Sequence, residues 1–390
     1  MADKPNAIIA ALLLGCVGVF AIMAQPILVE VLVNRGGFER SLAGKITAVE
    51  VLGTALGPVL AMAWMQRVSW RLAAAFALLV VIGGNLVATM LADTSLLMAL
   101  RFFVGLLGEG TAFALAIGIV GGTEQKDRNF AFLIAAQVTL GVVFFLALPL
   151  PREAGVSGVM LPLAGLALVA LATVGWVPHT GQGGHGHGGA TAAGSSSAPA
   201  YAALVVMLVW CTGLGAMWAF IKLIGIELTC SGCDDQAKAA AAIAVGQALG
   251  LSTALAVAGA LAAAALADRI GRIPPVAVAL LVQITMVLML KGHMGWAQFA
   301  ATTATFQIFW NLNGPYMMGT VALGDGSGKV SPLIPTAQIG GFFLGPVIVG
   351  RFLDQGAGLG AANTVAASCF LLALLLFVPV ARQVGARKKT

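Results

Sequence analysis

The sequence predicts an all-α membrane protein with twelve transmembrane helices, arranged as two pseudo-symmetric bundles of six. The chain of 390 residues is 59% hydrophobic and 9% charged, with a mean hydropathy of +0.98, whereas a soluble domain carries about 25% charged residues. Its apolar runs of about 20 residues are long enough to cross a bilayer core of about 30 Å. A basic cluster at 268–272 has a related cluster at 66–71, which indicates a duplicated chain. A very apolar soluble protein is the alternative, and the length of the runs argues against it.

The apolar runs place the predicted helices. In the first half they lie near 6–33, 42–65, 71–92, 95–121, 129–149 and 157–177. In the second half they lie near 201–228, 238–266, 274–291, 296–323, 331–352 and 358–381. The 50 glycines fit this class, because small residues let membrane helices approach closely. The polar start of the chain is short and the first apolar run is too long for a signal-peptide core, so we expect no cleavable signal peptide.

A stretch rich in Gly, His and Ser at 179–200 predicts a flexible cytoplasmic linker. It separates an N-terminal bundle at 1–178 from a C-terminal bundle with a short basic tail at 201–390. Two interpretations are open for the linker histidines: a metal site, or a solvated segment in which they bind nothing. These histidines are His179, His185 and His187.

The positive charges predict the orientation of the chain. If the N-terminus is cytoplasmic, the cytoplasmic side holds twelve Lys and Arg residues and the other side holds seven, which favours both termini inside. The net charge of +6 is then a topology signal, and we expect a bacterial inner-membrane protein in contact with lipid. Nucleic-acid binding is excluded as an interpretation of the basic pI, because the charges are scattered between apolar segments.

Two motifs resemble those of the major facilitator superfamily. The run Asp268-Arg269-Ile270-Gly271-Arg272 is similar to the family's cytoplasmic loop signature, Asp-Arg-x-Gly-Arg, and lies between two predicted helices. In the first-half copy, Gln66 replaces the acid and Ser69 the glycine. The segment 101–110 resembles the family's Arg-and-glycine signature. The resemblance implies two six-helix halves around a central midplane site.

The two basic clusters are candidates for a cytoplasmic gate. Their acid and arginines can pair with each other or with the carbonyls at helix ends. The alternative is a topology signal alone, which needs Arg and Lys but not Asp or Gly. The expected gate residues are Arg67, Arg71, Asp268, Arg269 and Arg272.

Two acids inside predicted helices, Glu50 and Glu109, are candidates for proton coupling. Ionisable residues within the membrane are costly and therefore indicate function. A carboxyl group in a low-dielectric site can take up and release a proton. The alternative is a structural ion pair or hydrogen bond with a neighbouring helix. Eight residues of α-helix rotate about 80° beyond two turns, so Arg101 and Glu109 need not share a face.

Cationic, amide and aromatic residues are candidates for substrate binding. Arg101 and Lys222, one from each half, can hold a carboxylate, and amides beside aromatic rings suit a ring with polar substituents. The alternatives are pairing of Arg101 within the protein, and aromatic packing with interhelical amide bonds. The expected substrate-binding residues are Arg101, Lys222, Gln307, Asn311, Trp218, Trp310 and Tyr316.

The five cysteines do not form a disulfide scaffold. Cys230 and Cys233 lie in a predicted outer loop, where oxidation is possible. We expect a local structural disulfide or two free thiols; a redox pair is the alternative.

The resemblance implies a secondary transporter that moves a small organic solute, such as an aromatic or carboxylic acid, by alternating access. We expect proton-coupled uptake by a monomer, without cofactor or metal. Proton-coupled efflux of drugs or amphipathic compounds is the alternative, and the absence of a proline after Gly141 argues against it, because the family's antiporters often carry Gly-x-x-x-Gly-Pro there. A membrane enzyme would need a clustered nucleophile or metal set, and a sensor would need a soluble signalling domain. Neither stands out in the sequence, so we expect neither an enzyme nor a sensor.

Overall fold

In the computed structural model, helices account for nearly all of the regular structure, and there is no strand among the residues that the structure describes. These residues are 4–65, 67–91, 93–123, 126–146, 154–179, 198–266, 270–325, 330 and 333–387. The chain divides into two compact units, Met1–Gly184 (unit 1) and His185–Thr390 (unit 2). The division falls inside the expected linker.

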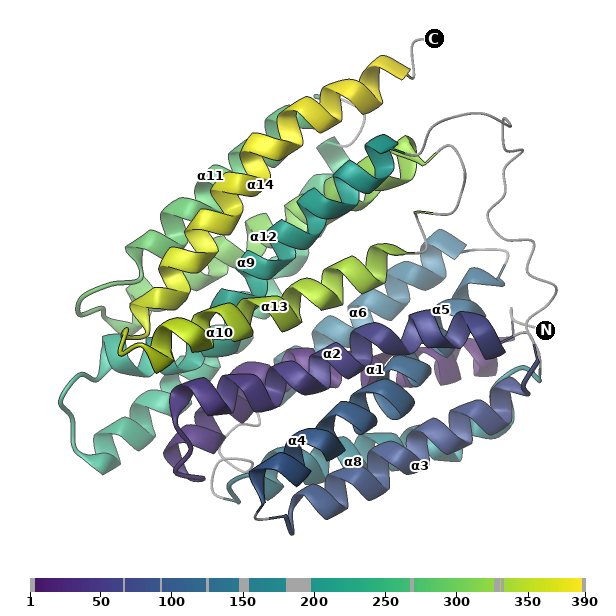
Figure 1. Cartoon of the computed structure of the whole chain (residues 1–390), viewed down its shortest axis with the longest axis horizontal. Helices are drawn as coiled ribbons and strands as arrows, with labels where there is room; N and C mark the ends of the chain where they lie inside the picture. The colour runs from purple at the N-terminus through teal and green to yellow at the C-terminus, as the bar shows by residue number, and fades with distance from the viewer. Residues whose placement is uncertain are drawn as a thin grey trace. The chain divides into compact units, whose positions relative to one another are not determined.

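Unit 1 contains six long helical segments, shown from purple to blue in Figure 1. The fourth is continuous but changes its winding, and the sixth is followed by a short 3₁₀ helix, η2 (Val174–Trp176). The six are α1 (Pro5–Asn34), α2 (Arg40–Trp64), α3 (Trp70–Ala88), α4–η1–α5 (Thr94–Phe103, Val104–Glu109 and Gly110–Gly121), α6 (Lys126–Leu146) and α8 (Ser157–Ala172).

Unit 2 contains six more, shown from teal to yellow in Figure 1. They are α9 (Ala198–Thr229), α10 (Asp235–Leu266), α11 (Ile273–Met289), α12 (Trp296–Gly324), α13 (Ile334–Asp354) and α14 (Gly360–Arg387). The described residues thus contain the twelve helical segments that the sequence predicts. The largest differences are at ends; the sixth helix, for example, stops at Ala172 where we expected it to continue to 177, because the chain tightens into η2.

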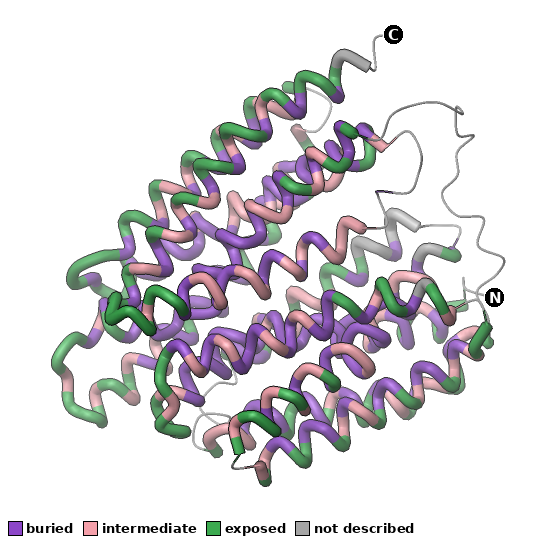
Figure 2. The backbone as a smooth tube through the Cα atoms, in the orientation of Figure 1, coloured by how far each residue is buried: buried purple, intermediate pink, exposed green. Residues whose placement is uncertain are grey.

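The helices have the length and composition of membrane spans. Among the described residues, eight helices are long and apolar enough to cross a bilayer, and three shorter apolar helices lie within α6, α8 and α11. Although α12 has 29 residues, it is not among them. Figure 2 shows α1 and α9 buried along most of their length, whereas α3 and α14 expose one side. Apolar side chains exposed on α3, such as Leu72 and Phe76, are suited to contact with lipid tails.

Equivalent helix pairs meet in the two units, which confirms the predicted pseudo-symmetry. In unit 1, α2 packs on α4 and η1, α3 packs on α8, and α1 packs on α6 and α8. In unit 2, α10 packs on α12, α11 packs on α14, and α9 packs on α13 and α14. Each unit therefore repeats the pairs second–fourth, third–sixth, first–fifth and first–sixth.

Glycines bring the paired helices into backbone contact. A Cβ added to Gly105 of η1 would overlap the Glu50 carbonyl oxygen of α2, and one added to Gly57 would lie 2.5 Å from the Cα of Gly110. In unit 2, a Cβ on Gly259 of α10 would overlap the carbonyl oxygen of Ile308 on α12. No side chain separates the two backbones at these points, so polar groups beside the crossings are shielded from lipid.

Candidate functional site

Unit 1 buries an ion pair between α4 and α2. Arg101 and Glu50 are each 1% exposed. Arg101 donates through Nε to Glu50 Oε2 at 2.9 Å and through Nη2 to Glu50 Oε1. Its Nη1 donates to Asn85 Oδ1 of α3 at 2.9 Å. The guanidinium thus meets the carboxylate as a two-pronged fork, the strongest geometry for such a pair.

This arrangement bears on the predicted anion site. All three guanidinium nitrogens of Arg101 donate to groups of unit 1, and the charge is matched by that of Glu50. Little capacity remains for a substrate carboxylate. The geometry favours the alternative interpretation, in which Arg101 pairs within the protein.

Glu109, at the end of η1, is bonded differently from Glu50. It is fully buried, and its Oε2 lies 3.0 Å from Thr54 Oγ1 of α2. Thr54 Oγ1 also lies 3.0 Å from the Glu50 carbonyl oxygen. Among the described residues, Glu109 Oε1 has no hydrogen-bond partner.

The Thr54 hydroxyl has a single proton, and this limits which protonation state of Glu109 fits the geometry. The hydroxyl can donate to only one of its two oxygen neighbours. If Glu109 is protonated on Oε2, it donates to Thr54 Oγ1, and Thr54 donates to the Glu50 carbonyl, so that both contacts are satisfied. If Glu109 is ionised, one contact is lost and a buried charge is left with a single donor. The protonated carboxylic acid therefore fits the arrangement better.

A π-helical turn lies between the two charged positions of the fourth helix. In a regular α-helix, Glu109 would point about 80° away from Arg101. The π turn of Val104–Glu109 takes in about one extra residue, which removes about 100° of rotation. Both side chains consequently reach α2, one at Glu50 and the other at Thr54 one turn later. The regular helix that we expected at 95–121 did not include this turn.

Unit 2 contains an aromatic cluster centred on Trp310. Trp310 of α12 lies with its ring centroid 5.5 Å from that of Trp218, 6.3 Å from Phe306 and 5.6 Å from Phe342. Phe306 in turn lies 6.0 Å from Phe370 of α14. The cluster joins α9, α12, α13 and α14 around one indole ring. Two of its members, Trp218 and Trp310, are predicted site residues.

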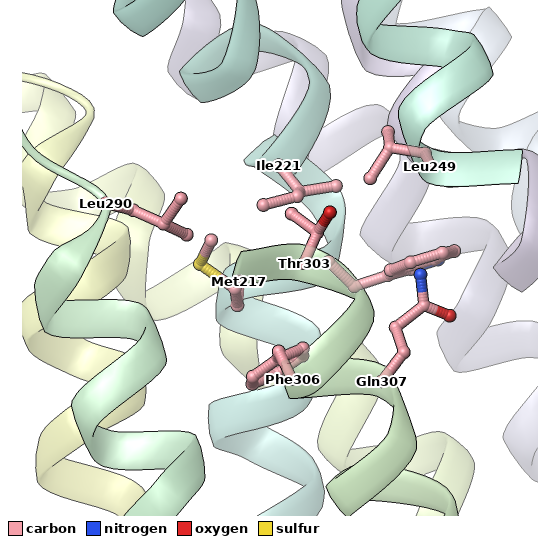
Figure 3. A pocket seen from close by; sticks show the side chains of 8 residues that line it. Met217, Ile221, Leu249, Leu290, Thr303, Phe306 and Gln307 are labelled. Carbon is pink, nitrogen blue, oxygen red and sulfur yellow. The ribbon is translucent and has the colours of Figure 1, made fainter. Parts of the chain in front are cut away.

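A cavity of about 10 Å³ lies beside this cluster, roughly the room that one water molecule needs. Figure 3 shows Thr303, Phe306 and Gln307 projecting toward it from α12, with Leu249 and Leu290 on opposite sides in this view. The lining residues are Met217, Trp218, Ile221, Leu249, Leu290, Thr303, Phe306 and Gln307.

The polar groups of unit 2 are amides with incomplete bonding. Gln283 Oε1 accepts from Trp210 Nε1 at 3.1 Å, and Asn311 Nδ2 donates to the Gln307 carbonyl oxygen at 3.0 Å. Among the described residues, neither Gln307 Nε2 nor either amide atom of Asn313 has a partner, although all three atoms are buried. Asn313 was not among the expected substrate-binding residues.

The remaining predicted binding residues are buried helix residues. Lys222 is fully buried in α9, and Tyr316 is 4% exposed in α12. Lys222 and Arg101 belong to different units, so the predicted pairing of these two cations around one anion stays a prediction.

The gate residues are only partly described. Asp268 and Arg269 lie outside the described residues, as does Gln66. Arg272 Nη1 donates to the Tyr316 carbonyl oxygen of α12 at 3.3 Å. Arg67 is exposed.

In unit 1, the side chain of Arg71 contacts the last described residues of the unit. Its Nε donates to the Val177 carbonyl oxygen at 2.6 Å, and its Nη1 lies 2.9 Å from His179 Nε2. The Trp70 N–H donates to the His179 carbonyl oxygen at 2.9 Å. The start of α3 is thereby tied to the segment that follows η2.

Some of the cysteines and histidines singled out in the sequence lie among the described residues, and others do not. Cys230 and Cys233 form a disulfide, which is one of the two expected states. His185 and His187 lie outside the described residues. Among the residues that are described, no group of three metal-binding side chains occurs.

Comparison with solved structures shows what this architecture resembles. The structure of the nucleoside transporter NupG is similar with a TM-score of 0.73 and 11% identity, covering 99% of this chain and 98% of that one. The POT family transporter PepTSo is similar with a TM-score of 0.72 and 12% identity, covering 98% of this chain and 99% of that one. The chain has the fold of the major facilitator superfamily.

A third structure supports this assignment. The peptide transporter POT has a TM-score of 0.72 and 13% identity, covering 97% of this chain and 96% of that one. A scan against protein-family models finds no match to the sequence, and a search of curated proteins finds none. The major facilitator fold is therefore established by the arrangement of the helices, which persists although few residues are identical.

Three buried polar residues are absent from the set of site residues expected from the sequence: Thr54, Asn85 and Asn313. Each is a polar residue inside an apolar run, and each is fully buried. Hydropathy averages hide single amides and hydroxyls, because their contribution to a window of about 19 residues is small. The available signal was the general rule that polar residues within membrane helices have partners or functions.

Proposed function

We propose that this chain is a proton-coupled secondary transporter for a small organic solute, with Glu109 as the proton-carrying group. The observation that carries this proposal is the bonding of Glu109. It is fully buried, it shares one oxygen with Thr54, and its second oxygen has no partner among the described residues. The major facilitator fold supports the transporter class, and the solved relatives transport nucleosides or peptides.

Charge balance connects the proton to the conformation. With Glu50 ionised, Arg101 cationic and Glu109 protonated, this cluster is neutral. When the proton leaves Glu109, the cluster gains one negative charge in a low-dielectric site, where an unbalanced charge is costly. A conformation that admits water or a cation to Glu109 is then favoured. Protonation and deprotonation on opposite sides of the membrane would drive alternating access.

Glu50 has a different role in this proposal. Both of its oxygens accept hydrogen bonds from Arg101, so its charge is neutralised by a fixed partner. We assign it to holding Arg101 in place beside η1. Of the two acids predicted to couple protons, Glu109 is the carrier and Glu50 is structural.

The basic clusters are proposed as the cytoplasmic gate. Arg71 and Arg272 both donate to carbonyl oxygens within their own unit, which supports a role in ordering the cytoplasmic helix ends. Arg67, Asp268 and Arg269 complete the proposed set. This assignment requires both termini to be cytoplasmic, which cysteine labelling of Lys4→Cys in intact cells and in inverted vesicles tests.

The proposal is tested by reconstitution into liposomes with an imposed pH gradient. The probes are uridine, dialanine, benzoate and benzamide, chosen to represent nucleosides, peptides, aromatic acids and aromatic amides. The wild type is expected to accumulate at least one probe when the outside is acidic. Glu109→Gln is expected to abolish accumulation while retaining exchange of the same probe across the membrane, because solute binding does not need the proton.

An exposed acid in the same unit supplies the control. Glu39 precedes α2 and is exposed, so Glu39→Gln should accumulate solute like the wild type. Accumulation by Glu109→Gln at the wild-type level would exclude Glu109 as the carrier. Transport that ignores the pH gradient in the wild type would exclude proton coupling altogether.

A further inference from the structure

The middle of α12 is unusually polar for a membrane helix. It is long enough to span a bilayer but is not among the helices that qualify by composition. Two of its amide side chains do not face water: Gln307 is 4% exposed, and Asn313 is fully buried. Buried amides normally have hydrogen-bond partners, and an unsatisfied one destabilises the protein. Two such amides, Gln307 and Asn313, lie within this segment, and a bound ligand is one way to supply the missing bonds.

These amides flank a single aromatic ring. Gln307 lies three residues before Trp310, and Asn313 lies three residues after it. In a helix, each is displaced from Trp310 by about 60° to opposite sides and by about 4.5 Å along the axis. The two amides are therefore about 9 Å apart along the helix, with an indole ring between them.

Pro315 adds a backbone acceptor to the same segment. It lies inside α12, and proline has no N–H to give to the carbonyl four residues earlier. That carbonyl belongs to Asn311, next to Trp310. Within two helical turns, α12 thus offers amide donors at Gln307 and Asn313, an acceptor at Asn313 and a backbone acceptor at Asn311.

Neither buried cation of the predicted anion site is free: Arg101 is matched by Glu50 and Asn85 in unit 1, and Lys222, fully buried in unit 2, already interacts with another group. Given the transport function proposed above, we propose that the substrate is an uncharged molecule with a planar ring and hydrogen-bonding groups at both ends, which the segment Gln307–Pro315 of α12 recognises. The ring packs on the Trp310 cluster, and the polar ends pair with Gln307 and Asn313. Under this proposal, the carboxylic acids expected from the sequence are not substrates.

The small cavity agrees with the position of one end of such a ligand. Gln307 lines it together with Phe306 and Trp218, and Figure 3 shows the Gln307 amide reaching its edge. At about 10 Å³, the cavity has room for one water-sized group. A ring-sized ligand therefore requires the surrounding side chains to move.

Matched ligand pairs test the substrate class. Binding to the purified full-length protein in detergent is measured by calorimetry for 4-hydroxybenzamide against 4-hydroxybenzoate and for nicotinamide against nicotinate. In each pair the amide and the acid have nearly the same shape and differ in charge. The amide is expected to bind at least about 10-fold more tightly. Tighter binding of either acid, or binding of no amide, would overturn the proposed class.

Substitutions distinguish ligand recognition from a structural role. Gln307→Leu and Asn313→Leu are each expected to weaken amide binding about 5- to 30-fold, the usual effect of losing one hydrogen bond to a buried group. The melting temperature of the ligand-free protein should stay constant or rise, because an unpartnered amide is replaced by an apolar group. A lower melting temperature together with unchanged binding would assign both amides to packing.

The control lies on the same helix. Gln298 is exposed near the start of α12, and Gln298→Leu should leave amide binding unchanged. Because binding is measured at equilibrium without a pH gradient, its result is independent of proton coupling. Amide preference without gradient-driven uptake would retain the substrate class and reject the coupling proposal. Gradient-driven uptake without amide preference would retain the coupling proposal and reject the substrate class.

Discussion

The two units share their helix arrangement but differ in what they bury. In unit 1, the contact between α2 and the fourth helix encloses an ion pair and a second acid, Glu109. In unit 2, the equivalent contact between α10 and α12 encloses hydroxyls, with Ser252 Oγ 2.8 Å from Thr303 Oγ1. The same unit also buries an aromatic cluster, several amides and the side chain of Lys222. A duplicated scaffold has therefore diverged in its polar chemistry while keeping its packing.

If the proposed function is correct, this difference assigns proton coupling to one unit and solute recognition to the other. A proton carrier needs ionisable groups, which must be neutralised when they are buried. Recognition of an uncharged solute needs hydrogen-bonding groups and a ring surface, which carry no net charge. Under the proposal, the first set of groups belongs to unit 1 and the second set to unit 2.

The largest expected effect comes from breaking the ion pair of unit 1. Arg101→Ala should lower the free energy of unfolding by about 3–5 kcal/mol, because it leaves Glu50 as an uncompensated buried charge. The measurement is unfolding of the purified protein in detergent. The double variant Arg101→Leu/Glu50→Leu should recover much of the loss, because neither charge remains.

An exposed pair in unit 2 is the matched control. Lys238 and Asp235 approach within 3.8 Å, but both side chains are exposed. Lys238→Ala should give no measurable change. An equal loss of unfolding free energy for the two pairs would mean that burial does not explain the large effect expected at Arg101.

Close packing should be equally important in both units. Gly105→Ala and Gly259→Ala each place a Cβ on a backbone carbonyl of the partner helix. Each should lower the free energy of unfolding by about 1–3 kcal/mol, the usual effect of overpacking. Gly165→Ala, which meets nothing within 4 Å, is the control. A loss in only one unit would contradict the common scaffold.

A neutral hydrogen bond should matter less than the ion pair. Gln283→Leu removes the acceptor of the Trp210 indole N–H and should lower the free energy of unfolding by about 1–2 kcal/mol, because the donor is left buried without a partner. Adding Trp210→Phe removes the donor as well and should restore part of this loss. A double variant that is worse than the sum of the single ones would show that the bond is not the relevant interaction.

The smallest effect is expected at the basic cluster of unit 1. Arg71→Ala removes two contacts at a partly exposed site, to Val177 and His179. The loss of free energy of unfolding should be about 1 kcal/mol or less. The more sensitive measurement is hydrogen exchange at 174–179, which should become faster. Arg67→Ala, at an exposed residue of the same cluster, should leave this exchange unchanged.

Much of the fold was predictable from hydropathy. The helix ends agree within a few residues for most segments, because a run of apolar side chains has no alternative to crossing the bilayer as a helix. The loop signature was also informative: Gly271 has φ +67°, a conformation that glycine adopts readily. Ser69, its counterpart, precedes α3 with φ −60° and ψ 125°. The first loop turns differently and does not need glycine there.

The site was predictable only as a set of candidates. Arg101, Glu50 and Glu109 stand out as charges inside apolar runs, but their pairing does not follow from their positions. Glu50 and Arg101 are 51 residues apart, and whether they meet depends on the rotation of two helices. The π turn of Val104–Glu109 in turn sets the direction of Glu109 relative to Arg101.

The sequence by itself determined the class of protein, the number of helices, their duplication and the residues whose burial demands an explanation. These properties depend on composition and on local apolar runs, because an apolar segment is more stable in lipid than in water. The tertiary structure alone decided that Arg101 is bonded to Glu50, that Glu109 has a partner on only one oxygen, and that Gln307 and Asn313 remain unpartnered within the described protein. Those outcomes depend on distances of about 3 Å between helices that are far apart in the chain, which only the packing of each unit sets.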